Sequence, residues 1–114
     1  MRRLDEIELA PRDRAAIEEA ARILRARLPV EQIVLFGSKA RGDDRPDSDV
    51  DLLVLTRDPV SRPGRHSARH ALRPVEERHG VFLSLLVVPA VEWREGMISV
   101  LPIHREVEEQ GAAA

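Results

Sequence analysis

The stretch Val34–Leu55, VLFGSKARGDDRPDSDVDLLVL, determines how the chain is organised. Ile33 to Phe36 form a continuous apolar run, as expected of a strand that is buried on both faces. Gly37 follows at the point where the backbone must turn and where a ligand must approach closely. Ser38 then offers a hydroxyl and an N–H group at the start of a helical turn, a position that suits a phosphate oxygen. The first half of the stretch therefore predicts a phosphate-binding turn.

The second half of the stretch carries two carboxylates. Side chains alternate along a strand, so Asp49 and Asp51 share one face while Val50 and Leu52 take the other. Like charges this close raise each other's pKa unless a cation lies between them. Mg²⁺ is a hard cation that binds carboxylates and substrate phosphates together. A lone pair of aspartates would be interpreted as a solvated strand entry, but beside a Gly-Ser turn it predicts phosphoryl or nucleotidyl transfer.

Three other known motifs do not fit the same residues. The turn is no P-loop, because the upstream glycine and the Lys-Ser/Thr order are missing around Lys39. EF-hand offsets are matched by four aspartates: Asp47, Asp49, Asp51 and Asp58. An EF-hand loop nevertheless needs glycine where Leu52 stands, inside a strand-like run. Metal-dependent glycosyltransferases also use an Asp-x-Asp motif, but they normally need a larger fold than this chain can form.

Two motifs, GSKARG at Gly37–Gly42 and SDVDLLV at Ser48–Val54, resemble those of the minimal nucleotidyltransferases of the DNA polymerase β-like superfamily. The family pattern is Gly-Ser, a short intervening stretch (here Lys39–Ser48) and then acid-hydrophobic-acid. The resemblance implies an enzyme that transfers a nucleoside monophosphate, AMP from ATP, to an acceptor hydroxyl. Gly37 and Ser38 would hold the triphosphate, and Arg41 would neutralise phosphate charge. Mg²⁺ would be bound by Asp49 and Asp51.

The same resemblance implies a partner. Short members of the family accompany helical HEPN (higher-eukaryote-and-prokaryote nucleotide-binding) proteins as antitoxins, and they add AMP to a tyrosine of the HEPN toxin. Relatives that act on small molecules carry a further helical domain over the open face of the sheet, for which this chain has no residues. We therefore expect either a complex with a helical HEPN-family protein or a homo-oligomer.

One position departs from the family pattern. The family places a third carboxylate on the strand after the second helix, facing the aspartate pair. That position is Ser84 here, and no acidic residue lies between Val81 and Val88. Glu92, just past the strand, is the nearest substitute along the chain. The alternative function is thus a catalytically weak or inactive nucleotide-binding antitoxin or scaffold, which neutralises its partner by binding.

The order of elements predicts the fold. Pro11 begins a helix that ends near Arg27, and the two strands of the central stretch follow. Proline and glycine indicate a loop at Arg57–Gly64, followed by a helix over Arg65–His79 that Pro74 kinks or restarts. The apolar Val81–Val88 predicts a central strand, and Pro102 begins a last helix that Gly111 ends. These elements predict an α/β fold with one small mixed sheet covered by helices.

Composition limits the class of protein. The 114 residues, 43% hydrophobic and 33% charged, predict one domain over 1–114 with mobile ends at about 1–4 and 111–114. A net charge of −2 argues against general nucleic-acid binding. The absence of cysteine and of long apolar runs leads us to expect a cytoplasmic protein without membrane attachment. Two side-chain groups in and just before the second helix are interpreted as solvated: the stripe Arg62, Arg65, Arg69 and Arg73, and the pair His66 and His70.

Overall fold

The computed structural model describes all residues, 1–114. The elements in chain order are β1 (Arg2–Arg3), the 3₁₀ turn η1 (Leu4–Glu6), α1 (Pro11–Arg27), β2 (Val30–Phe36), α2 (Ser38–Arg41), β3 (Val50–Thr56), α3 (Arg62–His70), α4 (Arg73–His79), β4 (Leu83–Pro89), α5 (Ala90–Glu95), the 3₁₀ turn η2 (Met97–Val100), α6 (Pro102–Gln110) and β5 (Ala112–Ala113). No helix combines the length and the apolar character that crossing a bilayer requires.

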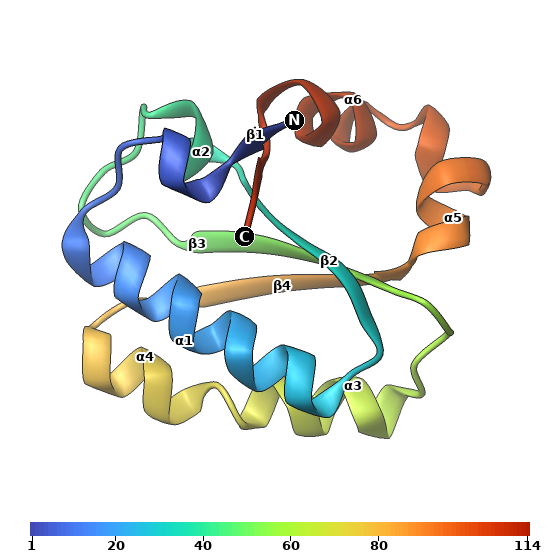
Figure 1. Cartoon of the computed structure of the whole chain (residues 1–114), viewed down its shortest axis with the longest axis horizontal. Coiled ribbons are helices and arrows are strands. Elements are labelled where there is room, and N and C mark those ends of the chain that lie inside the picture. The colour runs from blue at the N-terminus through green and yellow to red at the C-terminus, as the bar shows by residue number, and fades with distance from the viewer.

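The five strands form one mixed sheet in the order β1-β5-β2-β3-β4. β2 and β3, the two strands of the central stretch, are antiparallel neighbours, and β4 lies parallel to β3. The expected α/β architecture is therefore confirmed. Figure 1 shows α1, α3 and α4 on one side of this sheet and α5 and α6 on the other.

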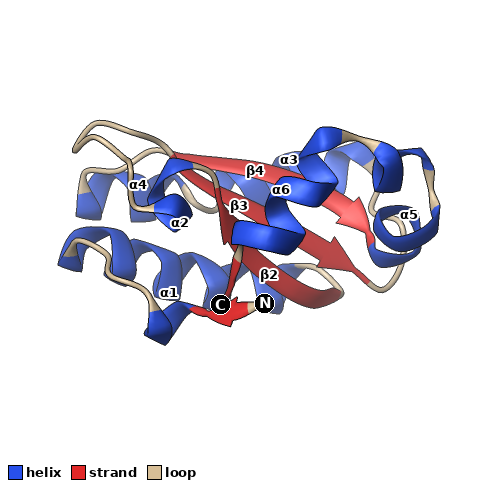
Figure 2. Ribbon diagram, turned by 90° about the horizontal axis from the view of Figure 1, so that it is seen from above, coloured by secondary structure: helices blue, strands red, loops and turns tan.

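Hydrophobic side chains divide into two cores, one on each face. The larger core, of 19 buried residues, joins α1, α3 and α4 to alternate residues of β2 and β3, such as Ile33 and Leu52. The smaller core, of seven, packs Trp93 of α5 and Val107 of α6 on Val34 and Leu53. Asp51 and Leu53 are two residues apart, so Asp51 belongs to the face that α5 and α6 cover only in part. Figure 2 looks onto the sheet from above, with α6 in front of its strands.

The predicted second helix is two helices, and the loop before it is shorter than expected. α3 already begins at Arg62, where the Ser61 hydroxyl accepts a hydrogen bond from the Gly64 N–H, a normal helix N-cap. It ends at His70, and α4 starts at Arg73 with Pro74 in its first turn. Pro74 thus restarts the helix, and Gly80 ends it in the left-handed conformation that glycine adopts easily (φ 67°).

β4 was predicted to be central, but it is an edge strand. Its apolar run over Leu83–Pro89 reflects helices on both faces rather than a strand on both sides, and Leu85 to Val87 remain half-buried. The termini also differ from the mobile ends expected. β1 pairs with β5, and β5 pairs with β2, so both ends of the chain are hydrogen-bonded into the sheet beside one another (Figure 1).

Candidate functional site

The Gly-Ser turn joins β2 to the one-turn helix α2. Gly37 precedes α2 with φ 75°, a conformation that side chains with a Cβ rarely adopt. The N–H groups of Ala40 and Arg41 both donate to the Gly37 carbonyl at 3.1 Å, which closes the turn. Ser38 is the first residue of the helix, as its position after the strand predicts.

Asp51 lies directly against this turn. The antiparallel register pairs it with Phe36, the residue before Gly37. A Cβ added at Gly37 would overlap the Oδ2 atom of Asp51, so any other residue here would have to displace that carboxylate. Asp49 precedes the first residue of β3 and is exposed. The fold therefore brings the turn and one carboxylate into contact, with the second carboxylate two residues away at the open end of the strand.

The surroundings of Asp51 disfavour the charged form of its carboxyl group. Burial raises the pKa of this carboxyl, and the charges of Asp49 and Glu106 raise it further. The Ser84 hydroxyl and the Arg41 guanidinium act in the opposite direction but do not outweigh these effects. Hard carboxylate oxygens with uncompensated charge fit a divalent cation such as Mg²⁺. Asp49 and Asp51 are the residues that could hold it, although no group of three or more His, Cys, Asp or Glu side chains is close enough to form a metal site.

Ser84 lies beside Asp51. The parallel register of β3 and β4 pairs the two residues, so their side chains leave the same face of the sheet. Glu92, the substitute considered from sequence, is wrongly placed for the site. It is in α5, after the opposite end of β4, and its carboxylate folds over Gly96. Glu92 is only eight residues from Ser84 in the sequence, but most of the length of β4 lies between them.

Arg41 and Glu106 form an ion pair next to the aspartates. The Arg41 Nη1 atom donates to Glu106 Oε1 at 2.5 Å, and its Nε donates to Asp43 Oδ2 at 3.2 Å. Both side chains of the Arg41–Glu106 pair are about one-third exposed, at 35% and 36%. Sequence reasoning missed Glu106 because it is far along the chain, in α6. The packing of Val107 against β2 and β3 brings α6 over this face.

Lys39, between Ser38 and Ala40, points away from solvent. Its Nζ atom lies 2.9 Å from Asp13 Oδ2 in α1 and 3.1 Å from Asp44 Oδ2 in the loop after α2. Burial alone would lower the pKa of this lysine, but the hydrogen bonds with both carboxylates raise it. The side chains of Lys39 and Asp13 are each only 2% exposed. This ion cluster, which sequence reasoning also missed, fixes the Gly-Ser turn to the first helix.

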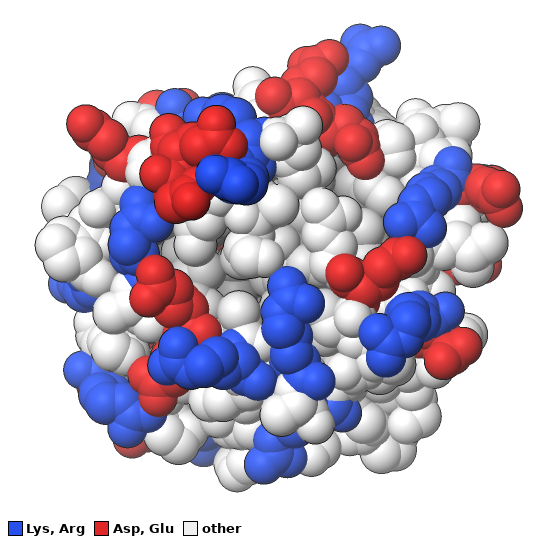
Figure 3. Space-filling model, viewed as in Figure 1, with Lys and Arg blue, Asp and Glu red and all other residues white.

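The arginine stripe lies elsewhere, on α3 and α4. Arg69 donates through both Nη atoms to Glu76, at 3.1 and 3.0 Å, and is therefore a structural residue. His66 and His70 are exposed. On the face drawn in Figure 3, basic and acidic side chains are interspersed rather than gathered by sign.

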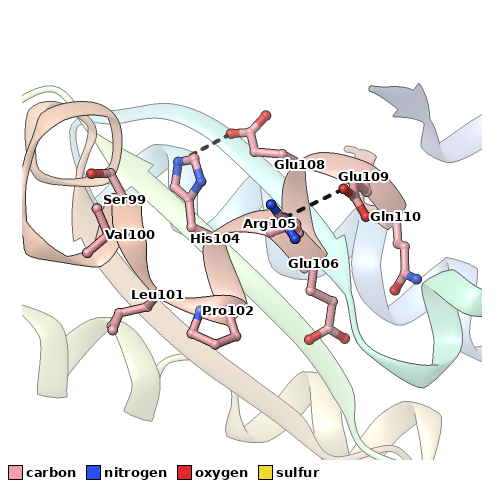
Figure 4. Close-up of a pocket in the computed structure, with 10 residues that line it drawn as sticks. All are labelled: Ser99, Val100, Leu101, Pro102, His104, Arg105, Glu106, Glu108, Glu109 and Gln110. Atoms are coloured by element: carbon pink, nitrogen blue, oxygen red, sulfur yellow. Dashed lines mark ion pairs between the residues drawn. The ribbon is translucent and has the colours of Figure 1, made fainter.

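A hollow of about 870 Å³ runs along α6, lined by residues from Ser99 to Gln110. It does not include Asp49, Asp51 or Gly37, and it meets the site only at Glu106. Figure 4 shows that Glu106 leaves the helix in a different direction from His104 and Glu108. These two residues are used structurally, since Glu108 accepts a hydrogen bond from Trp93 and His104 packs on the Trp93 ring.

Solved structures resemble this fold. One chain of a toxin–antitoxin complex with AMP-PNP is 22% identical (84% of this chain, 69% of that chain, TM-score 0.61). A chain from a complex of tri-AMPylated Shewanella oneidensis HEPN toxin with MNT antitoxin is 19% identical (89% and 70%, TM-score 0.56). A protein described as a minimal nucleotidyltransferase is 26% identical (86% and 88%, TM-score 0.58).

Comparison of the sequence with protein families identifies the family of this chain. No curated protein matches the chain significantly. Residues 17–106, however, match the nucleotidyltransferase domain family. The match runs from within α1 to the middle of α6 and includes the Gly-Ser turn and both aspartates. The chain therefore belongs to the nucleotidyltransferase domain family.

Proposed function

We propose that this chain is a Mg²⁺-dependent nucleotidyltransferase that moves AMP from ATP to a hydroxyl group of a protein partner. The observation that carries the proposal is the contact between the Gly-Ser turn and Asp51, in a chain that belongs to a nucleotidyltransferase family. The N–H groups of the turn suit phosphate oxygens, and the neighbouring carboxylates suit the cation that accompanies a triphosphate.

Each residue then has a chemical task. Gly37 and Ser38 hold the phosphate oxygens, and Arg41 neutralises part of the triphosphate charge once it exchanges Glu106 for phosphate. Asp49 and Asp51 hold Mg²⁺, which when bound offsets the charge that develops during transfer. The acceptor oxygen forms a bond to the α-phosphorus, and the bond to the pyrophosphate oxygen breaks. Pyrophosphate leaves with the electron pair, and the hydroxyl proton passes to solvent.

The acceptor is proposed to be a tyrosine of a helical HEPN-type toxin in the cytoplasm. Two similar structures are toxin–antitoxin complexes, and one of those toxins is AMPylated. The shape of the site supports a protein acceptor, because α5 and α6 cover only part of the face that carries Asp51. An open site leaves an acceptor unplaced and the nucleotide in contact with water, so a partner must supply proximity and exclude solvent.

Ser84 supports a second candidate, an antitoxin that binds nucleotide and partner but transfers slowly or not at all. The residue that pairs with Asp51 across β3 and β4 carries a neutral hydroxyl rather than a carboxylate. Loss of one charge-stabilising group costs on the order of 10²–10³ in rate in other enzymes. A slow enzyme and a binding protein are therefore the two alternatives to separate.

The test uses the chain with Mg²⁺, α-labelled ATP and the protein encoded beside it. Label on the partner's tyrosine supports transfer, whereas a tight unlabelled complex supports the binding function. The double variant Asp49→Asn/Asp51→Asn should lose both label transfer and metal-dependent ATP binding, because amides cannot replace the charge that holds the cation. If calorimetry shows unchanged binding of ATP and Mg²⁺ to this variant, the assignment of the site is wrong.

A further inference from the structure

We propose that the free edge of β4, together with the arginine stripe of α3, is a docking site for an extended acidic segment of a partner protein. The segment adds to the sheet as a further strand beside β4, with its acidic side chains against α3. None of the residues that carry this inference belongs to the nucleotide site, so the inference stands independently of the proposed function.

The outer edge of β4 offers backbone groups to a further strand. β4 is the last strand of the sheet, and Figure 2 shows it as the outermost of the long strands. The Val50 N–H donates to the Phe82 carbonyl at 2.8 Å, so the backbone groups of the even-numbered residues of β4 face β3. The backbone groups of the odd-numbered Leu85 and Val87 therefore point outward, where an added strand can pair with them.

This edge is closed at its beginning but carries no protection further along. The Leu83 N–H donates to Glu76 Oε2 at 2.9 Å, so the first donor of the edge already has a partner. Edge strands usually carry a charged residue or a proline, which prevents pairing with other chains. β4 has neither between Leu83 and Val88. An edge of this composition is a template for another strand.

A hollow of about 440 Å³ lies between this edge and α3. It is lined by Leu85–Val87 of β4 and by Arg62, Arg65, His66 and Arg69 of α3. The β4 residues are apolar and half-buried, so they provide contacts for the side chains of an extended segment. Because the strand edge and the cationic side chains share one hollow, an added strand contacts both.

The charge of the hollow determines which segment fits it. Arg69 pairs with Glu76, but Arg62 and Arg65 have no acidic partner. Arg65 donates only to a backbone carbonyl, that of Val60, at 2.6 Å. Carboxylates in an added strand satisfy these guanidinium groups through hydrogen bonds between charged groups. A second copy of this chain is disfavoured, because two β4 edges paired about a twofold axis place two arginine-bearing α3 helices side by side.

The experiment measures the binding of a fluorescein-labelled peptide of four Glu-Val repeats to the full chain, by fluorescence anisotropy. Wild type should bind this peptide, and the affinity should fall as salt is added, because the guanidinium groups are exposed. Arg62→Glu with Arg65→Glu should weaken binding by about 10- to 100-fold, because repulsion replaces hydrogen bonds between charged groups. The matched control, Arg45→Glu with Arg105→Glu, reverses two exposed arginines of other segments and should leave the affinity unchanged.

A second peptide separates strand addition from attraction by charge alone. The same sequence, N-methylated at every amide, keeps its carboxylates and side chains but donates no main-chain hydrogen bond. Its affinity for wild type should be lower by about 10-fold or more, because the pairing with Leu85 and Val87 is lost. A peptide of four Lys-Val repeats has the same shape with the opposite charge and should not bind measurably.

Several results would overturn the proposal. Absence of binding of the acidic peptide by wild type would remove it, and equal affinity of the N-methylated peptide would mean that no strand is added. Equal or tighter binding of a thymidine oligonucleotide of the same charge would assign the stripe to the phosphates of a nucleic acid. A wild-type dimer in light scattering that the acidic peptide dissociates would assign the edge to a second copy of this chain. Far-UV circular dichroism establishes that both double variants are folded.

Discussion

Lys39 and Arg41 are two residues apart in one helical turn, yet they neutralise carboxylates in opposite surroundings. Lys39 is buried between Asp13 of α1 and Asp44, with its side chain 2% exposed. Arg41 pairs with Glu106 and Asp43 at the surface, with its side chain 35% exposed. Each links α2 to another part of the chain, but only the second pair is accessible to a ligand.

The difference separates a structural ion cluster from an exchangeable one. Lys39 cannot release Asp13 without leaving an unpaired charge inside the protein, and Asp13 Oδ1 already has no hydrogen-bond partner. Arg41 and Glu106 can each turn to water at little cost. One turn of helix therefore carries both the anchor of the Gly-Ser turn and the side chain that we propose for phosphate.

The largest effect is expected when the anchor is broken. Lys39→Met should lower the free energy of unfolding by about 3–5 kcal/mol, because it leaves Asp13 buried without its counter-ion. Arg41→Met is the matched control and should change stability by less than about 1 kcal/mol, because its ion pairs are partly exposed. Urea unfolding followed by circular dichroism measures both.

If Lys39→Met and Arg41→Met lower the free energy of unfolding by the same amount, the distinction between a structural and an exchangeable ion cluster is wrong. A third variant, Lys39→Met with Asp13→Asn, removes the uncompensated charge. It should regain part of the lost stability, because a neutral amide costs less to bury than an unpaired carboxylate.

The reverse order is expected for ligand binding. Arg41→Met should weaken binding of Mg²⁺-ATP by about 10- to 100-fold, since a hydrogen bond between charged groups contributes about 1.5–3 kcal/mol. Arg45→Met, in the exposed loop that follows, is the control and should leave affinity unchanged. Isothermal titration calorimetry separates the two. Unchanged affinity in Arg41→Met would leave Arg41 as a partner of Glu106 alone.

The local part of this site could be predicted from sequence. The sequence predicts a strand from an apolar run, a turn from a glycine, and a second strand from alternating acidic and apolar residues. The structure contains these elements as β2, α2 and β3. The hairpin-like pairing of β2 with β3 then puts Asp51 against Gly37. Proline at the first turn likewise located the starts of α1 and α6. Each of these features depends on residues close together in the chain.

The rest depends on long-range packing that no local pattern carries. Glu106 reaches the site only because Val107 is buried, and an alternating or helical pattern does not say which strands lie beneath a helix. β4 has the composition of a central strand because helices cover both its faces, so its place at the edge was hidden. The buried role of Lys39 had one trace in the sequence, because it is the sole lysine among 18 basic residues.

The smallest effect concerns a third ion cluster, that of Glu76 with Arg69. Burial would raise the pKa of Glu76, but two hydrogen bonds from Arg69 and one from the Leu83 N–H hold it below its ordinary value. A lowered pKa in the folded state adds stability that is present above the unfolded pKa and is lost as the pH falls through the folded one.

The free energy of unfolding of wild type should therefore exceed that of Glu76→Gln by roughly 0.5–1 kcal/mol at neutral pH. This value is modest because the Arg69 side chain is 41% exposed. The difference should shrink between neutral pH and about pH 3, because a carboxyl that takes up a proton approaches the neutral amide in charge. Urea unfolding at the two pH values measures it, and a gap that is constant or widens with acid would mean that the Arg69–Glu76 contact does not set the charge of Glu76.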